Sequence, residues 1–292
     1  MSLLVCLRGC DGLVLATDSR GTVGDPRGAT AQNDRIKKLY LANEKVGILV
    51  AGAGDLGSSV VAGFLDLPGV SSLDVTELTM ALHRYAKRQF RKWFDLFAIR
   101  PIGSDTRPAR PDLNFIVAGL GSDQIPKIFR LSSSMDFAPM LHNYGFGMEG
   151  VTQYGHYLLS RLYDADNGVD ELQELAAYVI TETASQDGKV GGPVQVGIIA
   201  EDHAERLDMT AIDAIVLANQ TRSWLLRESF KRKSSMPGRT NLENPLHSSH
   251  DHGFLPPQYS SAFDGAHTAV THEEASALPA VADEHFATGV HW

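Results

Sequence analysis

The chain has 292 residues, of which 43% are hydrophobic, enough to bury the core of one large domain or two small ones. Its formal net charge of −9 argues against a protein whose main function is to bind nucleic acid, because such binding depends on an excess of Lys and Arg. Composition and charge therefore favour an acidic globular protein without a nucleic-acid partner.

The two cysteines, Cys6 and Cys10, are too few for a disulfide framework and form no repeated metal-binding pair. No apolar run approaches the roughly 20 residues that span a bilayer. The apolar part of the first residues is also too short for a signal peptide. We therefore expect a reducing, cytoplasmic location, no membrane partner, and no cofactor or metal.

The first third of the chain predicts a run of strands followed by two helices. Turn signals at Asp11-Gly12 and Asn43-Glu44 separate short apolar segments. Asp74, with Glu77 three residues later, forms a capping box before apolar residues at helical spacing. The predicted strands are 3–7, 13–17, 38–41 and 46–51, and the predicted helices are 55–67 and 74–98.

A Pro-rich polar loop over 101–111 separates this part from a repeat of the same order. The chain thus alternates groups of strands with pairs of helices, and it begins and ends with strands. This order lets two antiparallel sheets stack while helices cover both outer faces. The sequence therefore predicts an α+β fold, a four-layer αββα sandwich over residues 2–209. The later predicted strands are 114–120, 127–131, 138–144, 194–200 and the pair 206–207, and the later predicted helices are 152–163 and 170–184.

The last part of the chain changes in character. Residues 210–233 predict a C-terminal helix, because Trp224, Leu225 and Leu226 lie in a segment of helical spacing. Residues 234–292 form a polar, His-containing tail that we expect to be disordered. Its histidines are irregularly spaced and lack a cysteine or a regular histidine pair, so we expect no metal site there.

Several motifs follow one another in a recognisable order. They are the segment 11–24 (DGLVLATDSRGTVG), Ile36-Lys37-Lys38-Leu39, 51–55 (AGAGD), Gly145-Phe146-Gly147 and 187–192 (DGKVGG). Together they resemble the proteasome β subunit and so the proteasome-type peptidases of bacteria and archaea, over residues 2–207. The resemblance implies an N-terminal nucleophile hydrolase fold, which agrees with the predicted order of strands and helices.

The resemblance implies that the family's nucleophile is Ser2, a position found by counting back from the Asp11-Gly12 turn and Asp18. Removal of Met1 would expose this residue. An N-terminal Ser or Thr can act as nucleophile because its own α-amine can take the hydroxyl proton. The ordinary pKa of that amine, about 7.7 to 8.0, suits the exchange of a proton near neutral pH.

The resemblance also implies roles for four other residues. Lys38 would supply a positive charge that lowers the pKa of the Ser2 hydroxyl. Lys37 is the alternative, because a shift of register by one residue would exchange their faces. Asp18 would keep the lysine charged, and Gly52 would offer its backbone N–H to the oxyanion. Asp187 belongs to the group that orients the amino terminus.

Three departures from the family pattern bear on activity. Phe146 and Val190 stand where many family members keep serines that hydrogen-bond near the amino terminus, and Ser2 stands where threonine is usual. We expect these departures to make the site slower, differently tuned or inactive.

The resemblance implies hydrolysis of peptide bonds through an acyl-enzyme on Ser2, in a self-assembled ring or similar homo-oligomer. Its partners would be peptides or unfolded proteins and an ATPase. Two alternatives stay open. One is a catalytically silent structural subunit, and the other is an acyl transferase or peptide ligase, because an amine can attack the ester as water does.

Overall fold

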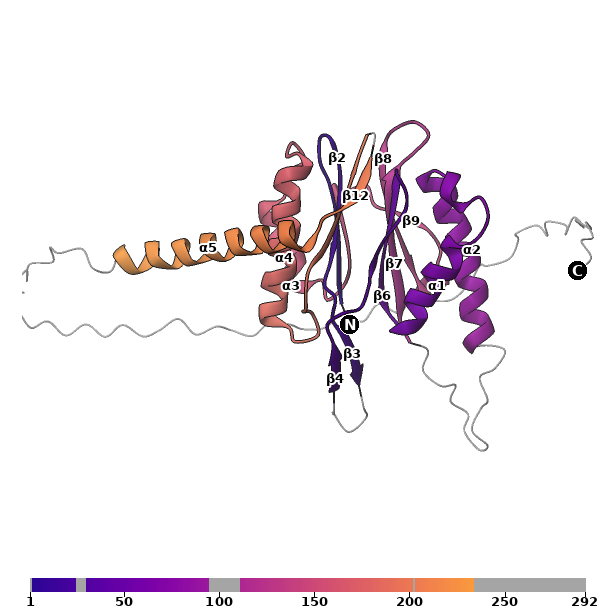
Figure 1. Ribbon diagram of the computed structural model, residues 1–292, viewed down its shortest axis with the longest axis horizontal. Helices are drawn as coiled ribbons and strands as arrows, with labels where there is room; N and C mark the ends of the chain where they lie inside the picture. Colours follow the sequence, from indigo (N-terminus) through magenta and orange to yellow (C-terminus); the bar gives the residue numbers. More distant parts are fainter. Residues whose placement is uncertain (1, 25–29, 95–110, 202, 234–292) are drawn as a thin grey trace, which may run out of the picture. The chain divides into compact units, whose positions relative to one another are not determined.

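The computed structural model describes residues 2–24, 30–94, 111–201 and 203–233, all within one compact unit, Met1–Pro237 (Figure 1). Residues 95–98 of the second predicted helix, nearly all of the Pro-rich loop 101–111 and the whole tail 234–292 lie outside the described residues. The predicted division into a domain, a C-terminal helix and a disordered tail therefore stays a prediction.

A five-stranded antiparallel sheet begins directly after Ser2, at Leu3. The first two strands are joined at the predicted Asp11-Gly12 turn, where the Gly9 N–H donates to the Gly12 carbonyl at 2.8 Å. Both strands are buried along almost their whole length, as expected when both faces of a sheet are covered. In spatial order the strands are β10 (Phe146–Gly150), β1 (Leu3–Arg8), β2 (Gly12–Thr17), β11 (Gln195–Ala200) and β12 (Ala204–Arg206).

A second five-stranded antiparallel sheet carries Lys38 and Gly52 at one end. The hairpin predicted around Asn43-Glu44 joins its first two strands, and Asn43 Oδ1 accepts the Lys45 N–H at 2.8 Å. Lys38 directly precedes the first strand and Gly52 ends the second. In spatial order the strands are β5 (Leu39–Asn43), β6 (Val46–Gly52), β7 (Leu113–Leu120), β8 (Pro126–Ser132) and β9 (Met140–Leu141).

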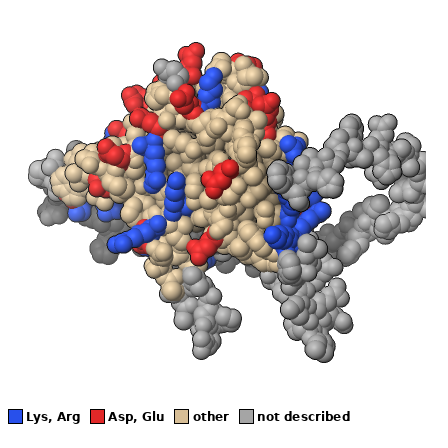
Figure 2. Space-filling model, turned by 45° about the vertical axis from the view of Figure 1, so that its right-hand side comes forward, with Lys and Arg blue, Asp and Glu red and all other residues tan. Residues whose placement is uncertain are grey.

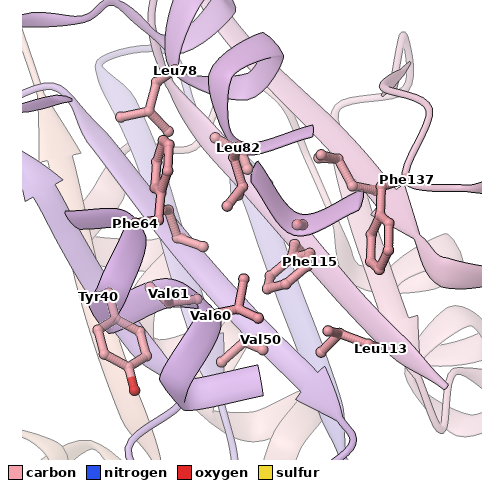
Figure 3. Packing of buried hydrophobic residues seen from close by; sticks show 14 of the residues in the cluster. Tyr40, Val50, Val60, Val61, Phe64, Leu78, Leu82, Leu113, Phe115 and Phe137 are labelled. Carbon is pink, nitrogen blue, oxygen red and sulfur yellow. The ribbon is translucent and has the colours of Figure 1, made fainter. Parts of the chain in front are cut away.

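Helices α1 (Asp55–Leu65) and α2 (Val75–Phe94), with the short 3₁₀ helix η1 (Val70–Ser72) between them, pack on the second sheet. The predicted capping box is present, since Asp74 Oδ1 accepts the N–H of Thr76 at 2.8 Å and of Glu77 at 2.9 Å. The apolar face of α2 meets Phe115 and Phe137 in the cluster drawn in Figure 3. This burial fixes the sheet that holds Lys38.

Helices α3 (Gln153–Leu162) and α4 (Val169–Gln186) pack on the first sheet, and α5 (Met209–Lys233) packs on α4. A third apolar cluster lies between the two sheets and includes Leu4, Leu15, Leu49 and Ile116. Figure 1 shows the two sheets side by side, with α1 and α2 beyond one sheet and α3 and α4 beyond the other. The predicted α+β class is confirmed.

The structure corrects the sequence analysis in two segments. Gly21–Gly24 (β3) and Thr30–Asn33 (β4) form a two-stranded hairpin that the analysis missed, because their glycines and polar residues give no apolar alternation. The strand predicted over 138–144 is only Met140–Leu141, and the next strand begins at Phe146. The start of β10 at Phe146 decides which residues of this strand lie beside Ser2.

Candidate active site

Ser2 lies directly before β1 and is buried, with only 5% of its surface exposed. Its hydroxyl oxygen is 2.7 Å from Lys38 Nζ, which donates to it. The two residues come from different sheets, so the packing of one sheet on the other brings them together. The result is a hydroxyl held by an amine in a site with little access to water.

Asp18 follows β2 and is fully buried. Its Oδ1 accepts from Lys38 Nζ at 2.9 Å and from the Leu3 N–H at 3.1 Å. Its Oδ2 accepts from the N–H groups of Arg20 and Gly191 at 3.1 and 3.2 Å. A buried carboxylate is tolerated when it is paired and hydrogen-bonded in this way. Asp18 therefore ties the start of β1 and the loop before β11 to the lysine.

The ammonium group of Lys38 donates three hydrogen bonds. It donates to Ser2 Oγ, to Asp18 Oδ1 and to the Arg20 carbonyl, the last at 2.6 Å. Burial lowers the pKa of Lys38 below its ordinary value, because the charged form loses its water. The negative charges of Asp18 and Asp34 oppose that lowering, and the positive charge of Arg20 adds to it.

Gln195, at the start of β11, fixes the backbone on which Lys38 stands. Its Oε1 accepts the N–H of Lys38 at 3.1 Å and of Leu39 at 3.3 Å, and its Nε2 donates to the Ile36 carbonyl at 2.7 Å. Gln195 is itself buried. A single amide thus holds the register of this segment, a role that sequence reasoning missed because one Gln in a strand carries no distinguishing pattern.

Of the two lysines left open by the sequence, Lys38 reaches Ser2 and Lys37 does not. Lys37 is exposed, and its Nζ lies 4.5 Å from the ring centroid of Tyr40. Adjacent side chains in an extended segment point to opposite sides, which explains the difference.

A small cleft of about 90 Å³ opens beside Ser2. Its walls include β3, the end of β6 and the start of α1. Within the described part of the chain, the buried hydroxyl of Thr22 in this wall has no hydrogen-bond partner. A buried polar atom left unpaired in a protein needs an explanation, and a group entering the cleft could supply the partner.

Gly52 lies in the same wall and has a backbone conformation that favours glycine. Its φ is +83°, and a Cβ added to it would collide with the carbonyl oxygen of Asp112. Ala53 and Gly54 follow with φ of 49° and 51°. A non-glycine residue with positive φ is a strained feature that tends to occur at functional sites.

Asp187 is not brought to Ser2. It directly follows the last residue of α4, and its Oδ1 accepts the Lys189 N–H at 2.9 Å. Among the described residues, no hydrogen bond joins Asp187 to Ser2. The loop it begins is held instead by Arg20, whose guanidinium pairs with Asp34 at 2.8 Å and donates to the Gly188 carbonyl at 3.1 Å.

The departure inferred at Phe146 is placed wrongly. Phe146 pairs with Leu7, at the far end of β10 from Ser2, and its ring packs on Tyr163. The backbone beside Ser2 is five residues later, where the Val151 N–H donates to the Ser2 carbonyl at 2.9 Å. The glycines at 145 and 147 lie at the other end of the strand, and Gly150 marks the end that lies beside Ser2.

Val190, the other departure, is fully buried in the apolar cluster beneath α4. Its carbonyl oxygen lies 3.4 Å from Arg20 Nη1. Its side chain therefore belongs to the core, and its backbone to the loop that reaches Asp18 through Gly191.

Across the described ranges, no group of three or more His, Cys, Asp or Glu side chains is arranged to hold a metal ion. No described helix is long and apolar enough to cross a membrane. On the face in Figure 2, acidic and basic side chains are both scattered over the described part of the molecule.

No known family model matches the chain, and no curated protein matches it. Solved structures do match. A mutant of Anbu from Hyphomicrobium sp. strain MC1 is 20% identical, with a TM-score of 0.59 over 80% of this chain and 100% of that one. Anbu from Yersinia bercovieri, described as an ancestral β subunit, is 18% identical, with a TM-score of 0.60 over 82% and 99%.

The fold is shared with Anbu. A third neighbour, from Pseudomonas aeruginosa, is 18% identical, with a TM-score of 0.62 over 83% of this chain and 100% of that one. It is described as the helical assembly of the Anbu complex. These neighbours correct the family inferred from the sequence, since Anbu is proteasome-like but distinct from the proteasome β subunits. No family model or curated protein supports a proteasome β-subunit peptidase.

Proposed function

We propose that the chain is an N-terminal nucleophile hydrolase, folded as a four-layer αββα sandwich, that cleaves peptide bonds with Ser2. The observation that carries this proposal is the buried 2.7 Å contact between Ser2 Oγ and Lys38 Nζ, backed by Asp18. Removal of the residue before Ser2 supplies the free α-amine that such chemistry uses.

In the first step the Ser2 hydroxyl oxygen attacks the carbonyl carbon of the peptide bond, and the hydroxyl proton passes to the α-amine of Ser2. The peptide nitrogen then leaves with that proton, and an ester joins the acyl group to Ser2. Water adds to the ester with the α-amine again taking a proton. Collapse of this second intermediate releases the acid and restores the Ser2 hydroxyl.

The surrounding residues act through charge and position. Lys38 stabilises negative charge on Ser2 Oγ, and Asp18 keeps Lys38 charged against the cost of burial. The N–H of Gly52, in the wall of the cleft, stabilises the oxyanion of the tetrahedral intermediates. Asp187 contributes indirectly, by shaping the loop that holds Asp18.

In this proposal the enzyme works in the cytoplasm as a homo-oligomer on peptides or unfolded proteins, with an ATPase as a further partner. The described helical assembly of the Pseudomonas aeruginosa neighbour supports self-association.

Labelling with a peptide β-lactone, followed by intact mass and peptide mapping, tests the proposal. We expect loss of Met1 and one adduct, located on Ser2. Ser2→Ala should abolish the adduct, whereas Ser122→Ala, a change of the same type at an exposed position, should leave it unchanged. Retained Met1, or an adduct that survives Ser2→Ala, would overturn the proposed nucleophile.

One observation favours a second candidate, a catalytically silent structural subunit. Within the described residues Asp187 makes no hydrogen bond to Ser2, so the group expected to orient the amino terminus is incomplete. A homo-oligomer that forms normally but takes no label would support this candidate. Joined peptides in place of cleaved ones would instead identify an acyl transferase or ligase.

A further inference from the structure

Helix α2 carries a row of basic side chains on its outer side, which we call the α2 basic row. Arg84, Arg88 and Lys92 recur at every fourth residue, so they share one face of the helix. All three are exposed, and within the described residues no carboxylate forms an ion pair with any of them. Like charges four residues apart destabilise a helix unless an anion compensates them. The row is thus an uncompensated positive surface on a chain whose net charge is −9.

Two neighbouring basic residues of α2 show the contrast, because they are already paired. Lys87 Nζ lies 2.5 Å from Asp136 Oδ2, and Arg91 Nη2 lies 3.3 Å from the same oxygen. The hydrogen bond from Lys87 lowers the pKa of Asp136 below its ordinary value. The carboxylate of Asp136 thus compensates these two cations, and the α2 basic row is left for another molecule.

A hollow of about 630 Å³ lies beside the α2 basic row. Its walls come from different elements. The end of α1 and η1 supply Leu67 and Val70, and α2 supplies Arg84, Tyr85 and Arg88. Leu67 is 39% exposed although it is large and apolar. Sites that bind ligands in proteins usually have volumes of about 300 to 1,000 Å³. The hollow is therefore large enough for a ligand, with one apolar wall and one basic wall.

The spacing of the two arginines fits an extended peptide. Residues four apart on a helix have Cβ atoms about 6 Å apart. Alternate residues of an extended chain lie on the same side, about 6.6 Å apart. Two acidic side chains at alternate positions can therefore reach Arg84 and Arg88 together, and a guanidinium can hold a carboxylate with two parallel hydrogen bonds. The residues between them point the other way, toward Leu67 and Val70.

The surroundings of the α2 basic row favour a protein partner over a membrane or a nucleic acid. A helix that binds a membrane surface inserts its apolar side. The apolar side of α2, with Leu78 and Leu82, is instead buried against the second sheet (Figure 3). Nucleic-acid binding neutralises many phosphates with many Lys and Arg side chains. The α2 basic row offers three, on an acidic chain.

We propose that this surface binds an extended segment of a partner protein in which acidic and apolar residues alternate. The acidic side chains pair with Arg84 and Arg88, and the apolar side chains cover Leu67 and Val70. The hollow lies beside the end of α1, whereas the cleft at Ser2 lies beside its start. Binding at this surface is therefore independent of the hydrolysis proposed at Ser2.

Fluorescence anisotropy of the full chain with short labelled peptides tests the alternation. The probe is fluorescein-GSELELESG. GSEEELLSG has the same composition and charge without the alternation, and GSESESESG lacks leucine. We expect the probe to bind about tenfold or more tightly than either control peptide, and its affinity to fall in high salt, because the ion pairs are exposed. Equal affinities for the three peptides, or no binding of the probe below about 1 mM, would overturn the inference.

Charge reversal of the row tests the same contact from the side of the protein. Arg84→Glu with Arg88→Glu should weaken binding of the probe about tenfold or more, because two attractions become repulsions. Both positions are exposed on a helix and Glu is a good helix former, so circular dichroism should stay unchanged. Lys45→Glu with Arg206→Glu is the matched control, since it changes the net charge equally at two exposed positions outside the hollow. Equal weakening by both double variants would contradict the proposed surface.

A short duplex DNA and vesicles of phosphatidylcholine with phosphatidylserine represent the other polyanions. If the wild type binds either of them more tightly than the probe, and Arg84→Glu with Arg88→Glu abolishes that binding, the partner is not a peptide and the inference is wrong. Labelling of Ser2 by the β-lactone should be unchanged in this double variant, since neither arginine lines the cleft. Peptide binding without labelling would reject only the proposed chemistry, and labelling without peptide binding would reject only this surface.

Discussion

At the scale of single residues, the site rests on one buried ion pair. Burial lowers the pKa of Lys38, and the carboxylate of Asp18, 2.9 Å away, opposes this lowering. Asp18 is in turn supported by backbone N–H groups, which come from segments that the chain brings together only when folded. The charge beside Ser2 therefore depends on complete folding of both sheets.

Loss of Lys38 should remove the reactivity of Ser2. We expect Lys38→Met to slow labelling by the β-lactone by roughly 100-fold or more, a typical effect for a residue that assists proton transfer or stabilises charge in the transition state. Lys37→Met is the matched control, because it removes a neighbouring lysine that is exposed and does not reach Ser2. Comparable slowing in both variants would contradict the assignment of Lys38.

The pH profile of labelling should be bell-shaped. The rate rises as the α-amine of Ser2 loses its proton, near pH 8. It falls again when Lys38 deprotonates, below the pH expected of an ordinary lysine, because burial lowers the pKa of Lys38. Asp18→Asn removes the charge that raises this pKa, so the falling limb should move to lower pH. A falling limb that stays in place would contradict a charged Lys38.

Gly52 should not tolerate a side chain. Gly52→Ala forces a Cβ against the Asp112 carbonyl at a φ of +83°, and we expect a loss of roughly 1–3 kcal/mol in the free energy of unfolding. Gly188→Ala is the control, since a Cβ there meets no atom within 4 Å, and it should change stability by less than about 0.5 kcal/mol. Urea unfolding measures the free energy of unfolding of both variants. Equal losses would show that the backbone conformation at Gly52 does not require glycine.

At the scale of elements, the register of the segment before β5 decides which lysine faces Ser2. Gln195→Leu would leave the N–H groups of Lys38 and Leu39 and the Ile36 carbonyl without their partner. We expect a loss of about 3 kcal/mol in urea unfolding and slower labelling of Ser2. Gln153→Leu, at an exposed position on α3, should change neither. Normal labelling in Gln195→Leu would mean that sheet packing alone sets the register.

The sequence predicts most elements, because their signals are local. Asp74 with Glu77, the turn at Asn43-Glu44 and the spacing of apolar residues in α2 each act within a few residues. The contact of Ser2 with Lys38 could be anticipated only from the order of motifs, since nothing local links positions in two sheets. The error at Phe146 has the same cause, because a motif places that residue while its position depends on strand register.

At the scale of the whole molecule, the proposed site and the exposed end of helix α5 are separate. Every described contact of Ser2, Lys38 and Asp18 comes from one chain, and the exposed side chains of Leu226 and Phe230 lie on a helix that does not line the cleft. Two surfaces that share no residue and no contact are expected to respond independently to mutation.

The double variant Leu226→Asp with Phe230→Asp should therefore label on Ser2 at the wild-type rate per chain when the probe is a small β-lactone. Intact mass spectrometry at matched chain concentrations measures this rate. Met80→Asp, a change at an exposed apolar residue of α2, is the control. A labelling rate that falls in the double variant but not in Met80→Asp would mean that the site around Ser2 depends on this end of α5.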